Sequence, residues 1–157
     1  SALDPLISRQ LQNEFMKLAS QMNKTTVFIT HDLDEAVRIG DRIAIMRDGR
    51  VVQTGTSEDS VLNPADDYVA DFVAGISRLT VVRAHAVMQD MKEFESAHGG
   101  LKKTAKTFAQ NASLKELIDH AILSEDPVAV VNGKGTPVGV ITRADLLRTV
   151  VEGTETS

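Results

Sequence analysis

The residues best placed to do chemistry stand together in "ITHDLDE", which ends at Glu35. In this stretch His31 is followed at once by acidic side chains, among them Asp32 and Asp34. Imidazole and carboxylate groups at this spacing could bind a metal ion, act in acid–base catalysis, or form a polar turn that happens to contain a histidine. A metal site is a weak interpretation, because no second histidine stands at ligand spacing and both aspartates can cap and polarise a helix instead.

A hydrolytic triad is weaker still, because nothing in the sequence supplies a nucleophile elbow. Local features alone therefore leave His31 as a histidine without a chemical role. The position of His31 in the chain, however, favours a functional role. An apolar run precedes it and a helix start follows it, and in open α/β sheets ligands bind at the carboxyl ends of the strands.

The composition is typical of a soluble globular protein, with 42% hydrophobic and 25% charged residues in a chain of 157. No apolar run approaches the roughly 18 residues of a membrane span. The absence of cysteine excludes disulfides and thiolate metal sites. Residues 1–74 hold 7 Lys+Arg and 12 Asp+Glu, whereas the rest hold 10 of each, so the net charge of −5 lies in the first half. This change in charge balance near residue 75 predicts two units. Neither has the basic excess of a nucleic-acid-binding protein.

The first half reads as helix, strand, helix and hairpin. Asp4 and Pro5 start a helix whose apolar residues recur at steps of three or four, and we expect it to bury one stripe: Ile7, Leu11, Phe15, Leu18 and Met22. The apolar, β-branched residues 25–30 predict a covered central strand. Asp32 then caps a second helix, which ends near Gly40.

Two short apolar runs follow, joined by Asp48 and Gly49, a pair that favours a tight hairpin turn. A short helix is expected from Thr56 or Ser57 to Asn63. Asp66 caps another helix, and its predicted buried face consists of Tyr68, Val69, Phe72 and Val73.

The second half is less regular at first. Residues 79–88 predict a strand leading into a helix, and residues 95–103 a loop. Ser113 and Glu116 then form a capping box for a helix with an apolar face of Leu114, Leu117, Ile118, Ala121 and Ile122. Residues 128–131 and 137–142 predict a hairpin, and residues 143–151 a closing amphipathic helix.

"SALDP" at the start and "TVFITHDLDEAVRIGDRIAIMRDGRVVQTGT" at residues 26–56 closely resemble the last third of an ABC transporter ATPase domain. With "NPADDYVADFV" after it, the run resembles the importers of quaternary amines such as glycine betaine, and of proline. The resemblance covers roughly residues 1–75. It implies that His31 is the switch histidine, which touches the γ-phosphate of ATP, and that Asp4 belongs to a loop that reports across a dimer interface.

The phosphate-binding G-x-x-x-x-G-K-[ST] motif is not in this sequence, and "NGKGTP" at residues 132–137 lacks its spacing. The family's LSGGQ signature and its Mg²⁺-binding acidic strand are also missing, and we expect them before Ser1. The chain is thus expected to be a fragment that does not hydrolyse ATP alone. The resemblance implies a parent that binds ATP and Mg²⁺, forms a homodimer, and drives a transmembrane permease subunit from the cytoplasmic face, served indirectly by a substrate-binding protein.

Residues 105–151, with "PVGVITRADLL" near the end, resemble a CBS motif of the cystathionine β-synthase type. The resemblance implies that Thr142 and Asp145 contact the ribose or phosphate of an adenosine nucleotide. The alternative is that Thr142 only ends a strand and that Asp145 only lies in the first turn of the following helix, where acidic residues are favoured. CBS motifs usually work in pairs, and residues 78–104 resemble a degenerate first motif. The resemblance therefore implies pairing with a second copy of the chain.

The predicted fold class is α/β, the C-terminal part of an ABC ATPase domain followed by a CBS region. The expected divisions are residues 1–75 for the ATPase part, 76–104 for a linker or degenerate CBS motif, 105–152 for a CBS motif, and 153–157 for a tail. The expected function is to power import of glycine betaine, L-proline or a related compatible solute, with the CBS region adjusting transport to osmotic or ionic conditions. The alternative is a non-enzymatic sensor that binds an adenosine nucleotide.

Overall fold

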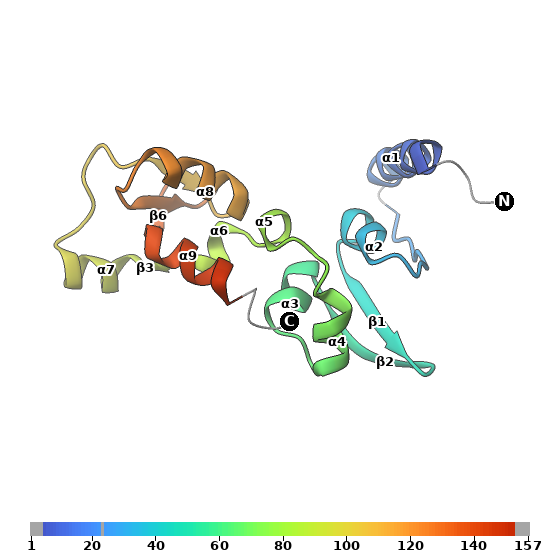
Figure 1. The fold of residues 1–157 in the computed structure, drawn as a ribbon. Coiled ribbons are helices and arrows are strands. Elements are labelled where there is room, and N and C mark those ends of the chain that lie inside the picture. Colours follow the sequence, from blue (N-terminus) through green and yellow to red (C-terminus); the bar gives the residue numbers. More distant parts are fainter. Residues whose placement is uncertain (1–4, 23, 153–157) are drawn as a thin grey trace. The chain divides into compact units, whose positions relative to one another are not determined.

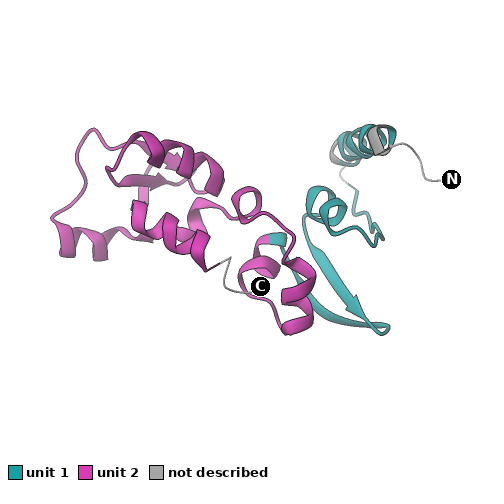
Figure 2. Ribbon diagram, viewed as in Figure 1, with its two compact units in different colours: residues 1–57 teal, residues 58–157 magenta. Residues whose placement is uncertain are grey.

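The computed structural model describes residues 5–22 and 24–152. The chain forms two compact units, residues 1–57 and 58–157 (Figure 2). Both contain helices and strands (Figure 1), which confirms the predicted α/β class. The change in charge balance near residue 75 falls inside unit 2, and the division of the chain at that point stays a prediction.

Helix α1, Pro5–Met22, confirms the predicted first helix of unit 1. Its apolar stripe, however, is exposed, with exposed fractions that run from 38% at Phe15 to 56% at Leu11. The prediction of burial was wrong because a stripe is buried only where a second apolar surface faces it. Within unit 1 the Phe28 ring reaches the stripe, with its centroid 6.5 Å from that of Phe15.

Residues 25–30 are extended but form no strand, which corrects the prediction of a covered central strand. Val27 is 85% exposed and Ile29 is 91% exposed. A strand needs a neighbour that accepts and donates its backbone hydrogen bonds, and no described residue pairs with this segment. The sequence pattern identified the extended backbone but not the missing partner.

Helix α2, Leu33–Ile39, has the predicted bounds and cap. The Asp32 side chain accepts a hydrogen bond from the Glu35 backbone N–H at 3.1 Å. Gly40 ends the helix, and its N–H donates to the Ala36 carbonyl. Helix α2 is therefore fixed by short-range capping.

Strands β1, Ile43–Arg47, and β2, Arg50–Gly55, form the predicted antiparallel hairpin. Asp48 has φ 49° and Gly49 has φ 74°, so both turn residues are left-handed. This is the conformation that a two-residue hairpin turn requires, and Asp-Gly tolerates it better than most pairs.

Helices α3, Ser57–Leu62, and α4, Asp67–Val73, follow the hairpin as predicted. Asp66 caps α4 by accepting from the Val69 N–H at 2.8 Å. The buried face of α4 is narrower than predicted, because Val69 and Val73 are buried while Phe72 is 39% exposed. The Phe72 ring instead stacks on its neighbour Tyr68, at 6.1 Å between centroids.

The prediction over residues 79–88 was wrong in its strand, because this part of the segment lies in a short helix, α5, Arg78–Val81, whereas the helix predicted after it is present as α6, Ala84–Val87. The backbone of residues 82–85, which includes the link between the two helices and the start of α6, hydrogen-bonds to residues 110–114. The Leu114 N–H donates to the Val82 carbonyl, and the Ala84 N–H donates to the Ala112 carbonyl, both at 2.9 Å. These long-range bonds replace a regular strand ladder.

Residues 95–103 were predicted as a loop, but helix α7, Met91–His98, covers the first part of this range. The Asp90 side chain caps α7, accepting from the backbone N–H groups of Lys92 and Glu93. Gly99, at φ 76°, ends it in the left-handed conformation. The loop therefore begins only after His98.

A four-stranded sheet organises the rest of unit 2, in the order β3-β6-β5-β4, with β4 and β5 parallel and the other pairs antiparallel. Its strands are β3, Gln89–Asp90; β4, Thr107–Ala109; β5, Val128–Val131; and β6, Pro137–Ile141. Helix α8, Leu114–Leu123, connects the parallel pair, and α9, Arg143–Val151, follows β6. The β5–β6 hairpin and both helices confirm the predictions, and the order after residue 105 is strand, helix, strand, strand, helix.

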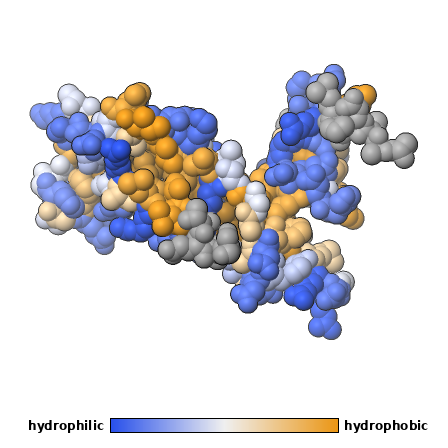
Figure 3. Space-filling model, viewed as in Figure 1, coloured by the Kyte–Doolittle hydropathy of each residue, from blue (hydrophilic) through white to orange (hydrophobic). Residues whose placement is uncertain are grey.

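The core of unit 2 lies between this sheet and its helices. It is built from Val82, Ala84, Leu114, Leu117, Val128, Val130, Ile141 and Leu146. The predicted apolar face of α8 is buried at Leu114 and Leu117, but Ile122 is 71% exposed. Figure 3 shows apolar surface over the region of α8 and α9.

Candidate functional site

In unit 1 the turn at residues 30–35 presents His31 to solvent. The Thr30 hydroxyl donates to Glu35 Oε2 at 2.7 Å and accepts from the Asp32 N–H at 3.0 Å. The Glu35 carboxylate also contacts the Gln12 side-chain amide from α1. The His31 ring hydrogen-bonds to none of the residues that the structure describes. The acidic side chains therefore hold the turn, and the imidazole is left available.

Asp4, the second predicted residue of this site, lies outside the described residues. Over residues 5–22 and 24–152, no three His, Asp or Glu side chains gather where they could hold a metal ion. In the same ranges no helix is long and apolar enough to cross a membrane.

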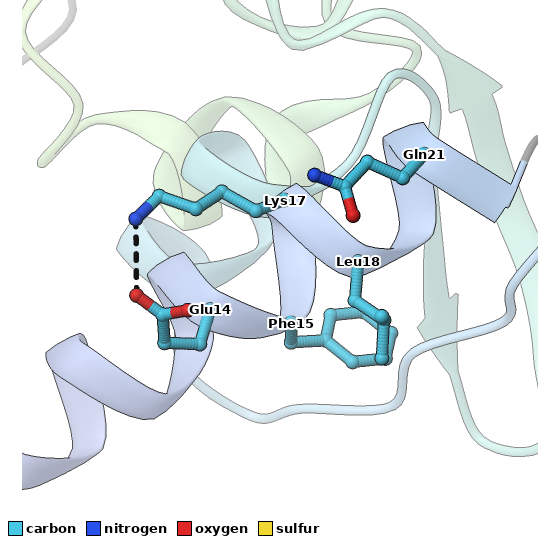
Figure 4. Close-up of a pocket in the computed structure, with 5 residues that line it drawn as sticks. All are labelled: Glu14, Phe15, Lys17, Leu18 and Gln21. Atoms are coloured by element: carbon cyan, nitrogen blue, oxygen red, sulfur yellow. Dashed lines mark hydrogen bonds and ion pairs between the residues drawn. The ribbon is translucent and has the colours of Figure 1, made fainter.

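A hollow of about 330 Å³ lies along α1 in unit 1 (Figure 4). An ion pair between Glu14 and Lys17, at 3.0 Å, lies on one side, and the Phe15 ring and Leu18 side chain lie together on the other. Gln21 completes the lining. All five residues belong to one helix, so they form an open groove that does not include His31.

A second hollow, of about 230 Å³, lies in unit 2. Its lining is mostly apolar and comes from α3, α4 and the residues after them. Arg78 and Glu152 are its charged members. The Arg78 guanidinium donates to the Thr149 carbonyl near the end of α9, at 3.4 Å. Neither hollow includes Thr142 or Asp145.

The structure brings the two predicted nucleotide contacts together at the junction of β6 and α9. The Thr142 hydroxyl donates to Asp145 Oδ2 at 2.6 Å, and the Thr142 N–H donates to the same oxygen at 2.9 Å. The Asp145 N–H donates in return to the Thr142 hydroxyl, at 3.3 Å. These reciprocal bonds form a capping box, so both residues fix the start of α9.

Gln89 is the third member of this cluster, and no sequence pattern indicates it. Its side-chain amide nitrogen lies 2.9 Å from Asp145 Oδ1 and 2.7 Å from Oδ2. Asp145 is only 6% exposed. A buried carboxylate needs several hydrogen bonds to offset its lost hydration, and Gln89 and Thr142 supply them. The Gln89 amide would therefore compete with a ribose hydroxyl for the Asp145 carboxylate.

A second capping box holds the start of α8. The Ser113 N–H donates to Glu116 Oε2 at 2.7 Å, and the Ser113 hydroxyl donates to the same oxygen at 2.8 Å. These two bonds, with the nearby charge of Arg83 as a smaller contribution, hold the pKa of Glu116 below its ordinary value. The box was predicted from the four-residue spacing alone.

No family model matches the sequence. The chain is similar to three curated ATP-binding proteins of transport systems. It is 38% identical to the trimethylamine N-oxide transport protein TmoW of Ruegeria pomeroyi, over 94% of the chain and 41% of the relative. It is 45% identical to the glycine betaine/proline betaine transport protein ProV of Escherichia coli, over 76% and 28%. It is 41% identical to the glycine betaine transport protein OpuAA of Bacillus subtilis, over 74% and 28%. The chain thus spans less than half the length of these relatives.

Two solved structures are similar to the chain at low sequence identity and low TM-score. A CBS domain-containing protein of Bacillus anthracis is 16% identical, with a TM-score of 0.30, over 76% of this chain and 75% of that one. The CBSX2 protein in complex with AMP is 12% identical, with a TM-score of 0.31, over 90% and 82%.

Proposed function

We propose that this chain, which is homologous to the C-terminal part of the ATP-binding subunits of betaine-type ABC importers, belongs to a subunit that powers import of glycine betaine, L-proline or a related compatible solute. The observation that carries the proposal is the 45% identity to the Escherichia coli glycine betaine/proline betaine relative over 76% of the chain. The parent would act at the cytoplasmic face of the membrane, on a permease subunit supplied by a substrate-binding protein.

The 157 residues do not themselves form the catalytic site for ATP and Mg²⁺, because no phosphate-binding loop is present in the sequence. We therefore derive no catalytic step within this chain, and we expect it to be inactive alone. In the longer parent, His31 is proposed to position the γ-phosphate and the attacking water. Its support is the exposed imidazole at the end of an extended segment, held by a turn whose carboxylates are already bonded. Phosphoryl transfer depends on such positioning and charge stabilisation.

The experiment compares ATP hydrolysis by the full-length parent with that of its His31→Ala variant. We expect kcat to fall by roughly 100-fold, as when one transition-state contact is removed, while ATP binding changes little. His98→Ala is the matched control, because His98 lies against Phe94 at 4.6 Å between ring centroids and far along the sequence from the proposed site. Near-normal turnover by His31→Ala would return His31 to a residue without a chemical role.

Asp4 is proposed to act at the interface between two copies of the ATPase part. Two copies are also the proposed arrangement of the CBS region. Support for the second pairing comes from the exposed apolar side chains of α8 and α9, among which Ile122 is 71% and Leu147 is 59% exposed. Apolar side chains gathered in this way commonly mark a protein–protein contact.

The CBS region, residues 105–152, is proposed to adjust transport by binding an adenosine nucleotide at Thr142 and Asp145. The support is the T-x-x-D spacing and the position of both residues at the N-terminus of α9, where the helix dipole favours bound phosphate. The alternative function, a non-enzymatic nucleotide sensor, rests on the same residues. Nucleotide binding by a parent that lacks ATPase activity would favour the sensor, whereas nucleotide-dependent change in its ATPase rate would favour regulation.

A further inference from the structure

A polar cluster outside the proposed sites joins α3 to the segment between α5 and α6. Glu58 Oε1 accepts from the Arg83 backbone N–H at 2.6 Å, and Glu58 Oε2 lies 2.9 Å from His85 Nε2. The Glu58 side chain is 15% exposed and that of His85 is 47% exposed. Both carboxylate oxygens of Glu58 are therefore directed at residues 83–85 from a position 25 residues earlier in the chain.

The other ring nitrogen of His85 faces a second acceptor. Nδ1 lies 3.2 Å from the Gln110 carbonyl oxygen, and the His85 backbone N–H donates to the same oxygen at 3.0 Å. Gln110 follows β4 directly. The imidazole therefore lies between α3 on one side and the end of β4 on the other.

The chemistry of the two partners decides which form of the ring fits. A carboxylate and a carbonyl oxygen only accept hydrogen bonds, and a neutral imidazole has a single N–H to donate. With a neutral ring, one nitrogen lone pair must face either the Glu58 carboxylate or the Gln110 carbonyl. The charged imidazolium donates from both nitrogens and bonds to both partners. We propose that His85 is a proton-operated link that joins α3 to the end of β4 when its ring is charged and loosens when the ring is neutral.

The surroundings leave Glu58 as the acid that acts on the ring. Of the two elements that pack most closely against α6, β6 carries no charged residue, and α9 carries Asp145, Arg143 and Arg148. Asp145 is bonded to Gln89 and Thr142, Arg143 is paired with Glu125, and Arg148 is exposed. On the side of α6 itself, Arg83 gives its backbone N–H to Glu58, while its charge acts on Glu116.

The link connects a segment that resembles the end of an ABC ATPase domain with the sheet of the CBS region. Protonation of His85 at low pH would hold α3 against that sheet, and deprotonation at high pH would weaken this contact. The ring is about half exposed, so the effect is modest. An exposed ion pair changes an equilibrium by about twofold to fivefold. Imidazole is the side chain that changes charge between about pH 5 and pH 8.

The test is amide hydrogen exchange of the whole chain, read for residues 57–62 and 82–88 at about pH 5.5 and about pH 8, after correction for intrinsic exchange rates. In the wild type we expect the opening equilibrium of α3 to rise about twofold to fivefold at the higher pH. The buried residues of α8 serve as the internal reference, because their exchange reports opening of the core.

Glu58→Gln makes the sharpest comparison. Its side-chain oxygen can still accept from the Arg83 N–H, and its amide can donate to a neutral His85 Nε2 while Nδ1–H donates to Gln110. This variant should therefore lose the pH dependence, whereas His98→Gln, which alters the histidine on α7, should keep it. His85→Asn should also lose it and serves if Glu58→Gln does not fold. Equal opening of wild-type α3 at both pH values, or an unchanged pH ratio in Glu58→Gln or His85→Asn, would overturn the proposal.

Discussion

The side-chain amide of Gln89 donates to both carboxylate oxygens of Asp145, although the two residues are 56 positions apart in the sequence. This contact ties β3 to the start of α9, where Asp145 is also held by Thr142. The same carboxylate is the proposed ribose contact. Stability of the apo unit and ligand binding therefore compete for one side chain.

Gln89→Ala is expected to strengthen binding of AMP or ATP by about threefold to tenfold, because the ligand no longer has to displace a hydrogen bond to a charged group. Isothermal calorimetry on the wild type and the variant measures the change. Asp145→Ala is the control and should abolish binding. Weaker binding by Gln89→Ala would contradict the competition, and absence of binding by all three proteins would contradict the proposed ligand site itself.

Gly139→Ala is expected to destabilise unit 2 by about 1–3 kcal/mol, because the site is already filled. A Cβ at this position would lie 2.6 Å from Met88 Sδ and 2.9 Å from the Gln89 carbonyl oxygen. The Met88 side chain can move, but the Gln89 backbone is held by β3 pairing with β6. Urea unfolding measures the loss. Gly133→Ala is the matched control, with nothing within 4 Å of its added Cβ, and a similar loss there would show that steric contact is not the cause.

The capping box of α8 gives the stability of unit 2 a defined pH dependence. Because its bonds to Ser113 lower the pKa of Glu116 in the folded state, the stabilisation is present above the ordinary carboxyl value of about 4.3 and is lost as pH falls through the lowered value. Glu116→Gln should thus be less stable than wild type near neutral pH, with the difference shrinking in acid. Urea titrations at several pH values test this, and Glu95→Gln, on the exposed face of α7, should show no such trend.

Leu147→Glu is expected to weaken self-association of the chain. The apolar face predicted for α8 includes Leu114 and Leu117, but the structure uses both for its own core, together with Leu146 of α9. The apolar side chains left exposed on α8 and α9 are Ile122, Leu123, Leu147 and Val151. Sedimentation equilibrium at increasing concentration compares the variant with wild type and with Lys134→Glu, an exposed change at the hairpin between β5 and β6. A monomeric wild type, or equal association by Leu147→Glu, would exclude this face.

The elements whose signals lie within a few residues were predictable from the sequence alone. Asp32, Asp66 and Ser113 cap their helices as predicted, since a cap bonds to backbone only two or three positions away. The hairpin turn at Asp48 and Gly49 follows from the conformations those two residues accept. The pair Thr142 and Asp145 was named from the resemblance to a CBS motif, and the two residues bond to each other because they are three positions apart at the start of α9.

Burial and long-range hydrogen bonds, which depend on residues distant in the sequence, became visible only in the folded structure. Periodicity marked the apolar stripe of α1 and the extended run before His31, but burial and strand pairing require a second surface. Among the described residues of unit 1, Phe28 reaches the stripe without burying it, and no strand pairs with the extended run. Residues 79–88 became two short helices because their backbone bonds to residues 110–114. The contacts of Asp145 with Gln89 and of His85 with Glu58 arise in the same way. No local pattern marks such pairs, because the fold alone brings their polar groups within hydrogen-bond distance.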